Sequence, residues 1–430
     1  MPFALCCLLF APSFAQHWDI EQVDSGGWGV GVQIRQHPDG RLFLCYGSTD
    51  GHGVRVAWKD SLWHTENVPQ PAQTNLNPPW LAIGPHGELG LTGSNDQQSW
   101  FSVREDTGWR SIAVPFEPEW YHPAIPVAFD SSAEPILNIV VGEGWVRPVG
   151  LARLVDSVWV ATDTISGGPH SPGYWLAGFG IRADGSPWGV EWIRVMDVGY
   201  WLEGVEGFEW QAGQWELHWW YGGERMFVEA VAGGVDREGV VHAAYGSDDS
   251  SGSFFRYDSE VIAANSPELI ALSFDSLNRP LLAYVAGSDL TLCYRDGATW
   301  RFLDVGVGAQ WLDVLVDSVG RPVIAYFTGD AVFTATGVDV LGQSEESAGP
   351  VLCRTQPLAT IVRGALELPR STSPSASTSW LLDISGCRAL DLHAGSNDVS
   401  RLAPGVYFVR SGPLAVSRQS SAVTKVVITR

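Results

Sequence analysis

The sequence contains almost no lysine. Only Lys59 and Lys425 occur in 430 residues, and 26 Lys and Arg stand against 48 Asp and Glu, which gives a net charge of −22. A protein that neutralises phosphates needs a basic surface, so this composition excludes nucleic acid as a partner. No apolar run of 18 residues follows the first 15 residues, so we expect no transmembrane span.

Cysteine and the common catalytic motifs are scarce as well. None of the six cysteines forms a C-x-x-C pair, and the ten histidines occur singly. The zinc-protease, nucleophile-elbow, phosphate-loop and calcium-loop patterns are all missing. The sequence therefore predicts no metal site, no cofactor and no catalytic residue, although calcium binding by an acidic turn stays open.

Glycine, tryptophan and apolar residues are abundant, and from about residue 28 to 342 they recur in a repeat. The clearest copies are residues 274–285 (FDSLNRPLLAYV) and 316–327 (VDSVGRPVIAYF), and five weaker copies lie upstream. A hairpin turn of this kind requires a residue that tolerates positive φ. Glycine fills that position in five copies, asparagine in one and alanine, the misfit, in one: Gly40, Gly87, Ala133, Gly185, Gly239, Asn278 and Gly320.

A second mark appears later in most copies, where a tryptophan follows a polar turn and introduces another strand. These residues are Trp63, Trp109, Trp159, Trp215 and Trp300. Four strands in units spaced 39 to 54 residues apart are typical of β-propeller blades, and no helical periodicity competes with that pattern. We therefore predict an all-β fold in which residues 16–342 form a seven-bladed β-propeller. A ring of six or eight blades and a β-sandwich array are the alternatives.

Two finer expectations concern this propeller. The last repeat has no Trp-led strand, and residues 18–23 resemble one, so the N-terminal strand should complete the final blade and cover its open edge. Four turn aspartates recur at equivalent places: Asp130, Asp236, Asp275 and Asp317. Because a catalytic group normally occurs once, this repetition favours a turn-capping role.

The N-terminus has the pattern of an export signal. Residues 3–11 are apolar, and small residues at Ser13 and Ala15 suit cleavage before Gln16, although the usual basic residue is missing. Residues 1–15 are therefore predicted to be a signal peptide, which would remove two cysteines. An exported chain permits disulfides, so a bond between Cys353 and Cys387 is an open prediction.

The C-terminal region differs from the propeller in composition. Residues 350–430 carry 9 Lys and Arg and 4 Asp and Glu, a net charge of +5, which leaves −27 for residues 1–349. We predict a linker with the first strands of a tail module at 343–379 and a small immunoglobulin-like β-sandwich at 380–430, with the module beginning as early as residue 350.

This tail resembles the C-terminal sorting domain (type A) of the bacterial type IX secretion system. The resemblance covers about 50 residues, and its strongest part is LAPGVYFVR at 402–410. The positions that match the family are Asp383, Gly386, Arg388, Asn397, Ser400, Leu402, Pro404, Gly405, Tyr407, Arg410, Lys425 and Arg430. Cys387 interrupts the first motif between Gly386 and Arg388. The resemblance implies export to the periplasm, recognition by the type IX machinery, and display at the outer-membrane surface of, or secretion from, a Gram-negative bacterium.

Candidate binding residues lie in the fourth repeat, which holds eight Trp between residues 175 and 220. We single out Trp188, Trp192 and Trp201 with Glu191 and Asp197, because exposed indole faces beside carboxylates suit stacking on sugar rings. Packing between blades is the commoner role of such tryptophans. Three hypotheses follow: a non-catalytic surface propeller that binds an extracellular glycan or protein, a secreted carbohydrate-active hydrolase or lyase, and a structural envelope protein or adhesin.

Overall fold

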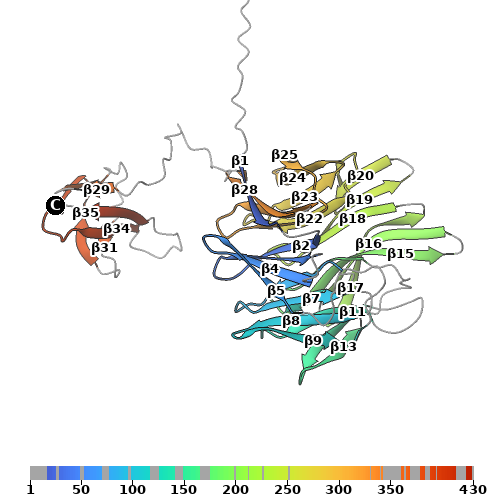
Figure 1. The fold of residues 1–430 in the computed structure, drawn as a ribbon. Coiled ribbons are helices and arrows are strands. Elements are labelled where there is room, and N and C mark those ends of the chain that lie inside the picture. Colours follow the sequence, from blue (N-terminus) through green and yellow to red (C-terminus); the bar gives the residue numbers. More distant parts are fainter. Residues whose placement is uncertain are drawn as a thin grey trace, which may run out of the picture. The chain divides into compact units, whose positions relative to one another are not determined.

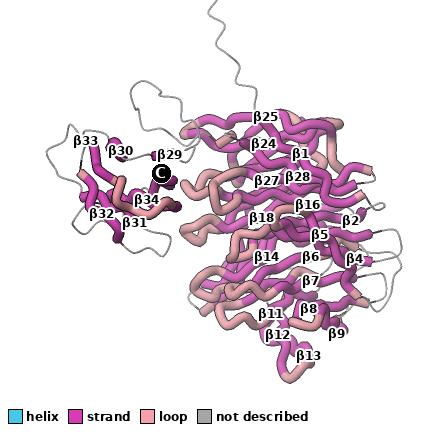
Figure 2. Tube along the Cα trace, turned by 60° about the vertical axis from the view of Figure 1, so that its left-hand side comes forward, coloured by secondary structure: helices cyan, strands magenta, loops and turns pink. Residues whose placement is uncertain are grey.

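The structure, a computed structural model, describes most of the repeat region and parts of the tail. The described residues are 17–25, 29–48, 53–69, 77–94, 98–116, 125–140, 149–164, 175–197, 200–211, 213–224, 227–249, 252–329, 331–338, 340–341, 360–362, 365–368, 378–382, 388–393, 395–412 and 423–428. The chain divides into two compact units, Met1–Gln343 and Ser344–Arg430. Strands are the regular elements of the described residues (Figure 2). Within them, no helix has the length and hydrophobicity that a membrane crossing requires.

The first unit is a seven-bladed β-propeller, as predicted, and each blade is a four-stranded antiparallel sheet (Figure 1). Blade 1 contains β2 (Gly29–Gln36), β3 (Leu42–Ser48), β4 (Gly53–Lys59) and β5 (Trp63–Val68). Blade 2 contains β6 (Trp80–Ile83), β7 (Leu89–Ser94), β8 (Ser99–Glu105) and β9 (Gly108–Val114). Blade 3 contains β10 (Val127–Phe129), β11 (Pro135–Val140), β12 (Val149–Val155) and β13 (Val158–Thr164). Blade 4 contains β14 (Trp175–Ile181), β15 (Pro187–Asp197), β16 (Tyr200–Gln211) and β17 (Gln214–Glu224).

The remaining blades follow the same order. Blade 5 contains β18 (Phe227–Val235), β19 (Val241–Asp249), β20 (Gly252–Tyr257) and β21 (Glu260–Ala263). Blade 6 contains β22 (Leu269–Phe274), β23 (Pro280–Ala286), β24 (Asp289–Asp296) and β25 (Thr299–Val307). Blade 7 contains β26 (Trp311–Val316), β27 (Pro322–Thr328), β28 (Ala331–Val338) and, as its outer strand, β1 (His17–Asp24).

The first strand of each blade lies on the inside of the ring. Each inner strand contacts the inner strands of both neighbouring blades, so that β2, β6, β10, β14, β18, β22 and β26 close a circle. Apolar side chains from facing blades fill the space between the sheets; Phe43 and Val56 of blade 1, for example, pack with Leu81 and Leu91 of blade 2. The core is thus divided among the blade interfaces, and the inner strands surround a central channel.

The N-terminal strand completes blade 7, which confirms the expectation for residues 18–23. β1 pairs antiparallel with β28, from His17 opposite Val338 to Asp24 opposite Val332 (Figure 1). The indole N–H of Trp18 donates to the backbone oxygen of Asp304 in blade 6, 2.9 Å away. The chain therefore closes the ring by covering the strand edge that its last repeat would otherwise expose.

All seven repeat turns have the same backbone geometry. The predicted position has φ between 63° and 97° in every copy, including Ala133 at 64° and Asn278 at 63°. In each turn the same pair of backbone hydrogen bonds closes the hairpin, as between Asp130 N and Glu134 O and between Ala133 N and Asp130 O. The hairpin thus imposes a left-handed conformation even on alanine, for which it costs about 1 kcal/mol or more.

The recurrent aspartates cap these turns. One carboxylate oxygen of Asp317 accepts hydrogen bonds from the backbone N–H groups of Val319 (3.1 Å) and Arg321 (2.8 Å). Asp130, Asp236 and Asp275 make the same two bonds in their own turns. These bonds confirm the turn-capping role that was predicted for the four aspartates.

The Trp-led outer strands are joined around the ring by a recurrent contact. The indole N–H of Trp109 donates to Glu66 of the preceding blade at 2.7 Å, and Arg104 forms an ion pair with the same glutamate. Equivalent trios are Trp63 with Glu21 and Lys59, and Trp300 with Glu260 and Arg295. These tryptophans hold neighbouring blades together at their outer strands.

The second unit contains two small sheets. The five-stranded sheet has the order β29 (Thr360–Val362), β35 (Val423–Ile428), β34 (Gly405–Gly412), β31 (Thr378–Leu382) and β32 (Arg388–Leu392), and β30 (Ala365–Leu368) pairs with β33 (Gly395–Asp398). Leu366 of β30 packs with Leu381, Leu392 and Val409 of the larger sheet. Buried Asn397 bonds the backbone of His393 through both its carbonyl and its amide group, 2.7 Å in each case. Side chains of both sheets thus share one small core.

Several predictions fall on residues outside the described part of the chain. They are the signal peptide at 1–15, the cysteine pair Cys353 and Cys387, and the motif residues Asp383, Gly386 and Arg430. Cys45 and Cys293 are free thiols buried within the propeller.

Candidate functional site

A cavity of about 700 Å³ lies inside the ring of blades. Its wall is formed by the inner strands β2, β14, β18, β22 and β26, by residues 78–80 at the start of β6, and by Trp188 and Trp192 of β15. Neighbouring inner strands run in the same direction, since Gly31 of β2 lies against Pro78 before β6, and Gly234 near the end of β18 lies against Phe274 at the end of β22. We call the end of the cavity where these strands begin the leading end, and the opposite end the turn end.

Three inner strands carry a β-bulge at the same point, and all three bulges line the cavity. The pairing register shifts at Gly31 in β2, at Ala177 in β14 and at Glu229 in β18. β22 and β26, in contrast, pair with their neighbours without a shift. A bulge re-aims the extra residue, and here it places one exposed carboxylate, that of Glu229, in the cavity wall.

Three tryptophans stand at the leading end. Trp80 and Trp311 are the first residues of β6 and β26, and Trp192 pairs with the first residue of β14. Trp80 is buried, whereas Trp192 and Trp311 are half-buried. Glu268, directly before β22, adds a second exposed carboxylate at this end.

An ion pair between blades 1 and 7 occupies another part of the wall. Asp313 Oδ2 lies 2.7 Å from Arg35 Nη1 and accepts a second hydrogen bond from the backbone N–H of Ile34 at 2.9 Å. Asp313 therefore largely neutralises Arg35 within the cavity.

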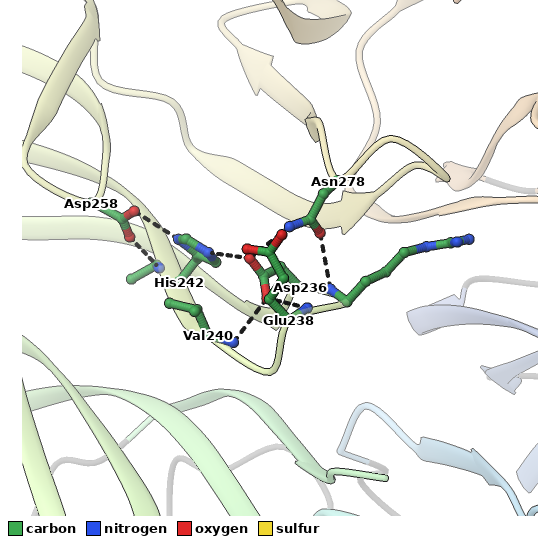
Figure 3. A network of polar contacts seen from close by, with 8 residues as sticks. Asp236, Glu238, Val240, His242, Asp258 and Asn278 are labelled. Carbon is green, nitrogen blue, oxygen red and sulfur yellow. Dashed lines mark hydrogen bonds and ion pairs between the residues drawn. The ribbon is translucent and has the colours of Figure 1, made fainter.

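At the turn end, a polar network links blades 5 and 6 (Figure 3). The Asn278 amide donates to Asp236 Oδ2 at 2.9 Å, and the His242 ring lies between Asp236 (3.3 Å) and Asp258 (2.8 Å). Burial disfavours the imidazolium, but the hydrogen bonds and charges of Asp258 and Asp236 outweigh it and raise the pKa of His242. Because the Asp236 carboxylate is fully engaged here, this network joins blades rather than presenting a free group to the cavity.

The candidate binding residues that the sequence predicted in the fourth repeat do not all line the cavity. Trp188 is only 7% exposed and packs with Val190, Val205 and Val228 at the interface of blades 4 and 5. Trp188 and Trp192 nevertheless both line the cavity. The side chains of Trp201 and Asp197 lie outside the described part of the structure, although their backbones belong to β16 and β15.

Glu191 does not face the cavity. It is 3% exposed and pairs across β15 and β16 with Glu206, which is fully buried. Burial raises the pKa of Glu206 to about 7, and burial followed by the Glu206 charge raises the pKa of Glu191 well above its usual value. The two carboxyls therefore favour protonated forms inside blade 4.

Two further buried glutamates of this blade are held by other contacts. Glu203 accepts a hydrogen bond from the backbone N–H of Val228 in blade 5 at 2.8 Å. Glu209 contacts both Arg182 and His218. Ligand atoms of Glu209, Glu216 and His218 lie within 4.8 Å of one another, which is a spacing at which three side chains could hold a metal ion. A cation there would have to compete with the guanidinium of Arg182.

Sequence reasoning did not select the residues that meet at the leading end. Glu229, Glu268, Trp80 and Trp311 come from four different blades, and no local motif joins them. One signal was present: Trp80 and Trp311, like Trp175, each stand at the start of the strand that leads into a repeat turn.

In the tail, the described motif residues have structural contacts. The Arg388 guanidinium lies 5.5 Å from the ring centre of Trp380 and pairs with Asp391. Pro404 directly precedes β34, Gly405 is its first residue, and the hydroxyl of buried Tyr407 donates to the backbone oxygen of Ala403 at 2.9 Å.

Two other motif residues lie in the paired strands of that sheet. The backbone of Arg410 in β34 is opposite Val423, and that of Lys425 in β35 is opposite Phe408. The sorting role of this unit stays a prediction.

Comparison with known proteins supports the fold. A polysaccharide lyase of family PL25, an ulvan lyase bound to -[GlcA(1-4)Rha3S]-, is 11% identical with a TM-score of 0.51, covering 74% of this chain and 95% of that chain. A second structure of a PL25 ulvan lyase gives 11% identity, a TM-score of 0.50 and the same coverage. YCF48 bound to a D1 peptide is 15% identical with a TM-score of 0.46, covering 77% and 97%. No family model and no curated protein sequence matches the chain. Identities this low establish the propeller scaffold and nothing further.

Proposed function

We propose that this chain is an exported β-propeller that binds carbohydrate, without catalysis, at the leading end of its central cavity. The observation that carries the proposal is the arrangement of Trp80, Trp192 and Trp311 with Glu229 and Glu268 around one open cavity. Its volume of about 700 Å³ lies in the range of small-molecule sites.

The chemistry of the wall suits a sugar. Indole faces and edges pack against the C–H faces of pyranose rings, while carboxylates accept hydrogen bonds from hydroxyl groups. Arg35 and Asp313 supply a further donor and acceptor in the wall. A ligand would thus find apolar platforms and polar partners on different blades that the ring holds in fixed positions.

Hydrolysis would require an acid and a base or nucleophile on either side of the scissile bond. Glu191 and Glu206 are the adjacent carboxyls with raised pKa values, and neither lines the cavity. We therefore favour binding over the hydrolase or lyase alternative. Release of new reducing ends or unsaturated products from a bound glycan would reverse that choice.

Binding can be tested by titrating the full chain with a panel of oligosaccharides in a calorimeter. The variant Trp311→Ala should weaken binding roughly 10- to 30-fold, because an aromatic anchor carries a large share of interface energy. Trp219→Ala is the matched control: Trp219 is 60% exposed on the outer strand β17 and should leave affinity unchanged. If no oligosaccharide of the panel binds, or if both variants behave alike, the cavity is not a glycan site.

The proposed location is the bacterial cell surface or the medium, reached through the sorting-like tail. Deleting residues 344–430 tests this in a Gram-negative host with a type IX system. We expect the truncated protein to accumulate in the periplasm, as cell fractionation and surface labelling would show. Surface delivery at the level of the full chain would refute the sorting role.

A further inference from the structure

The titratable side chains of the cavity do not contribute equally to its charge. They are Arg35, Asp313, Glu229, Glu268, Asp236 and Arg237. Asp313 compensates Arg35, and Asp236 is engaged by Asn278, His242 and the backbone of its own turn. Glu229, Glu268 and Arg237 are left with charges that no described neighbour compensates.

These remaining charges are separated along the cavity. Arg237 follows β18 in its hairpin turn and lies at the turn end, whereas Glu229 and Glu268 belong to the leading end. Within the described part of the chain, neither glutamate takes part in an ion pair. The leading end therefore carries an excess of negative charge beside its tryptophans.

The backbone fixes where both carboxylates stand. Glu229 is the extra residue of the bulge in β18, and the backbone N–H of Glu268 donates to Val285 of its own blade at 2.9 Å. β18 and β22 are neighbouring inner strands, so the two glutamates project from adjacent blades at the same end. The bulge position of Glu229 recurs in β2 and β14, where it holds Gly31 and Ala177, so blade architecture does not by itself require a carboxylate there.

Resting on the proposed function, we propose that the ligand is a cationic glycan, that is, a glycan with free amino groups. Its ammonium groups bind at Glu229 and Glu268, and its sugar rings pack on Trp192 and Trp311. The two carboxylates attract ammonium groups and repel uronate or sulfate groups. The charge of −27 on residues 1–349 adds long-range attraction for cations that falls with ionic strength.

The test compares two oligomers of equal length, one with free amino groups and one in which acetylation removes their charge. The full chain is titrated with a glucosamine oligomer and with its N-acetylated counterpart at about pH 5.5, where the amines are protonated and ordinary carboxyls are ionised. We expect the free-amine oligomer to bind more tightly, and its advantage to shrink as salt is added. Glu229→Gln and Glu268→Gln should each weaken its binding roughly 2- to 5-fold and weaken binding of the N-acetylated oligomer less, so that the advantage of the free-amine oligomer shrinks.

Glu238→Gln is the matched control, since Glu238 is an exposed glutamate in the turn of blade 5 that does not line the cavity. Equal affinity for both oligomers, or Gln variants that keep the wild-type selectivity, would overturn the charge inference. In that case, loss of binding in Trp311→Ala would still support a glycan site. Failure of every oligomer to bind would overturn the proposed function and this inference together.

Discussion

The buried pair Glu191 and Glu206 predicts a stability that falls as the pH rises. Glu206 is 0% exposed and stands opposite Glu191, itself 3% exposed, across the β15–β16 pairing. Burial raises the pKa of Glu206 from 4.5 to about 7. Burial and then the neighbouring charge raise the pKa of Glu191 well above 4.5, so we expect Glu191 to keep its proton while Glu206 loses one.

The sign follows from proton linkage. Between pH 4.5 and about 7 the folded chain holds a proton on Glu206 that the unfolded chain has released. The free energy of unfolding that this group contributes is therefore greatest below pH 4.5, declines through this window, and is constant above about pH 7. At 1.36 kcal/mol for each pKa unit, the decline is about 3 kcal/mol.

The variant Glu206→Gln removes the titration, because glutamine is uncharged and similar in shape to the protonated acid. We expect urea denaturation, followed by tryptophan fluorescence, to show that the variant gains about 3 kcal/mol relative to wild type between pH 5 and pH 8. Titrating groups that do not interact with Glu206 cancel in this comparison, and burial, the larger cause, still raises the pKa of Glu191 in the variant. The exposed control Glu238→Gln should follow the wild-type curve at both values of pH.

A difference below about 0.5 kcal/mol between the two pH values would refute the reasoning. It would mean that Glu206 titrates like an exposed carboxyl and that water or a counter-charge reaches the blade interior. Loss of stability in the variant at both pH values alike would point instead to an essential contact of the carboxyl group.

Three further predictions concern the propeller scaffold. Ala133→Gly should stabilise the chain by about 1 kcal/mol in urea denaturation, because φ is 64° there; destabilisation would show that the alanine side chain contributes packing. Trp109→Phe and Glu66→Gln should each lower the free energy of unfolding by about 1 kcal/mol, and their effects should be non-additive in a double-mutant cycle. Full additivity would exclude a coupling between the two side chains. Deleting residues 17–24 should lower the melting temperature and cause aggregation measurable by light scattering, since β28 becomes an open edge; unchanged melting would contradict closure by β1.

The sequence was sufficient to predict the propeller because each blade repeats one local requirement. A tight hairpin needs positive φ at a fixed position, and a glycine-rich column satisfies it in all seven copies. The same reasoning predicted β1, because residues 18–23 resemble an outer strand that has no blade of its own. Even Ala133 conforms, which shows that the flanking strand pairing decides the geometry where the residue itself disfavours it.

The cavity could not be predicted in this way, because its wall depends on register. A shift of one residue moves a side chain to the other face of a strand, and the bulges at Ala177 and Glu229 make such shifts. In blade 4, Trp192 reaches the cavity while the adjacent Glu191 is buried. The sequence places both residues in one strand without assigning their faces.

The positions of the tryptophans explain why the tryptophan-rich fourth repeat did not predict most of the residues that line the cavity. On outer strands, the indole N–H groups of Trp63, Trp109 and Trp300 bind a glutamate of the preceding blade, so these residues act as clamps. Blade 4 gathers tryptophans because β15, β16 and β17 are 11, 12 and 11 residues long, longer than the other strands of the propeller that are described. Trp80 and Trp311 stand in regions of ordinary tryptophan content but begin inner strands. In this fold the position of a tryptophan within its blade is a better guide than the local density of tryptophan to whether its side chain lines the cavity or packs against a neighbouring blade.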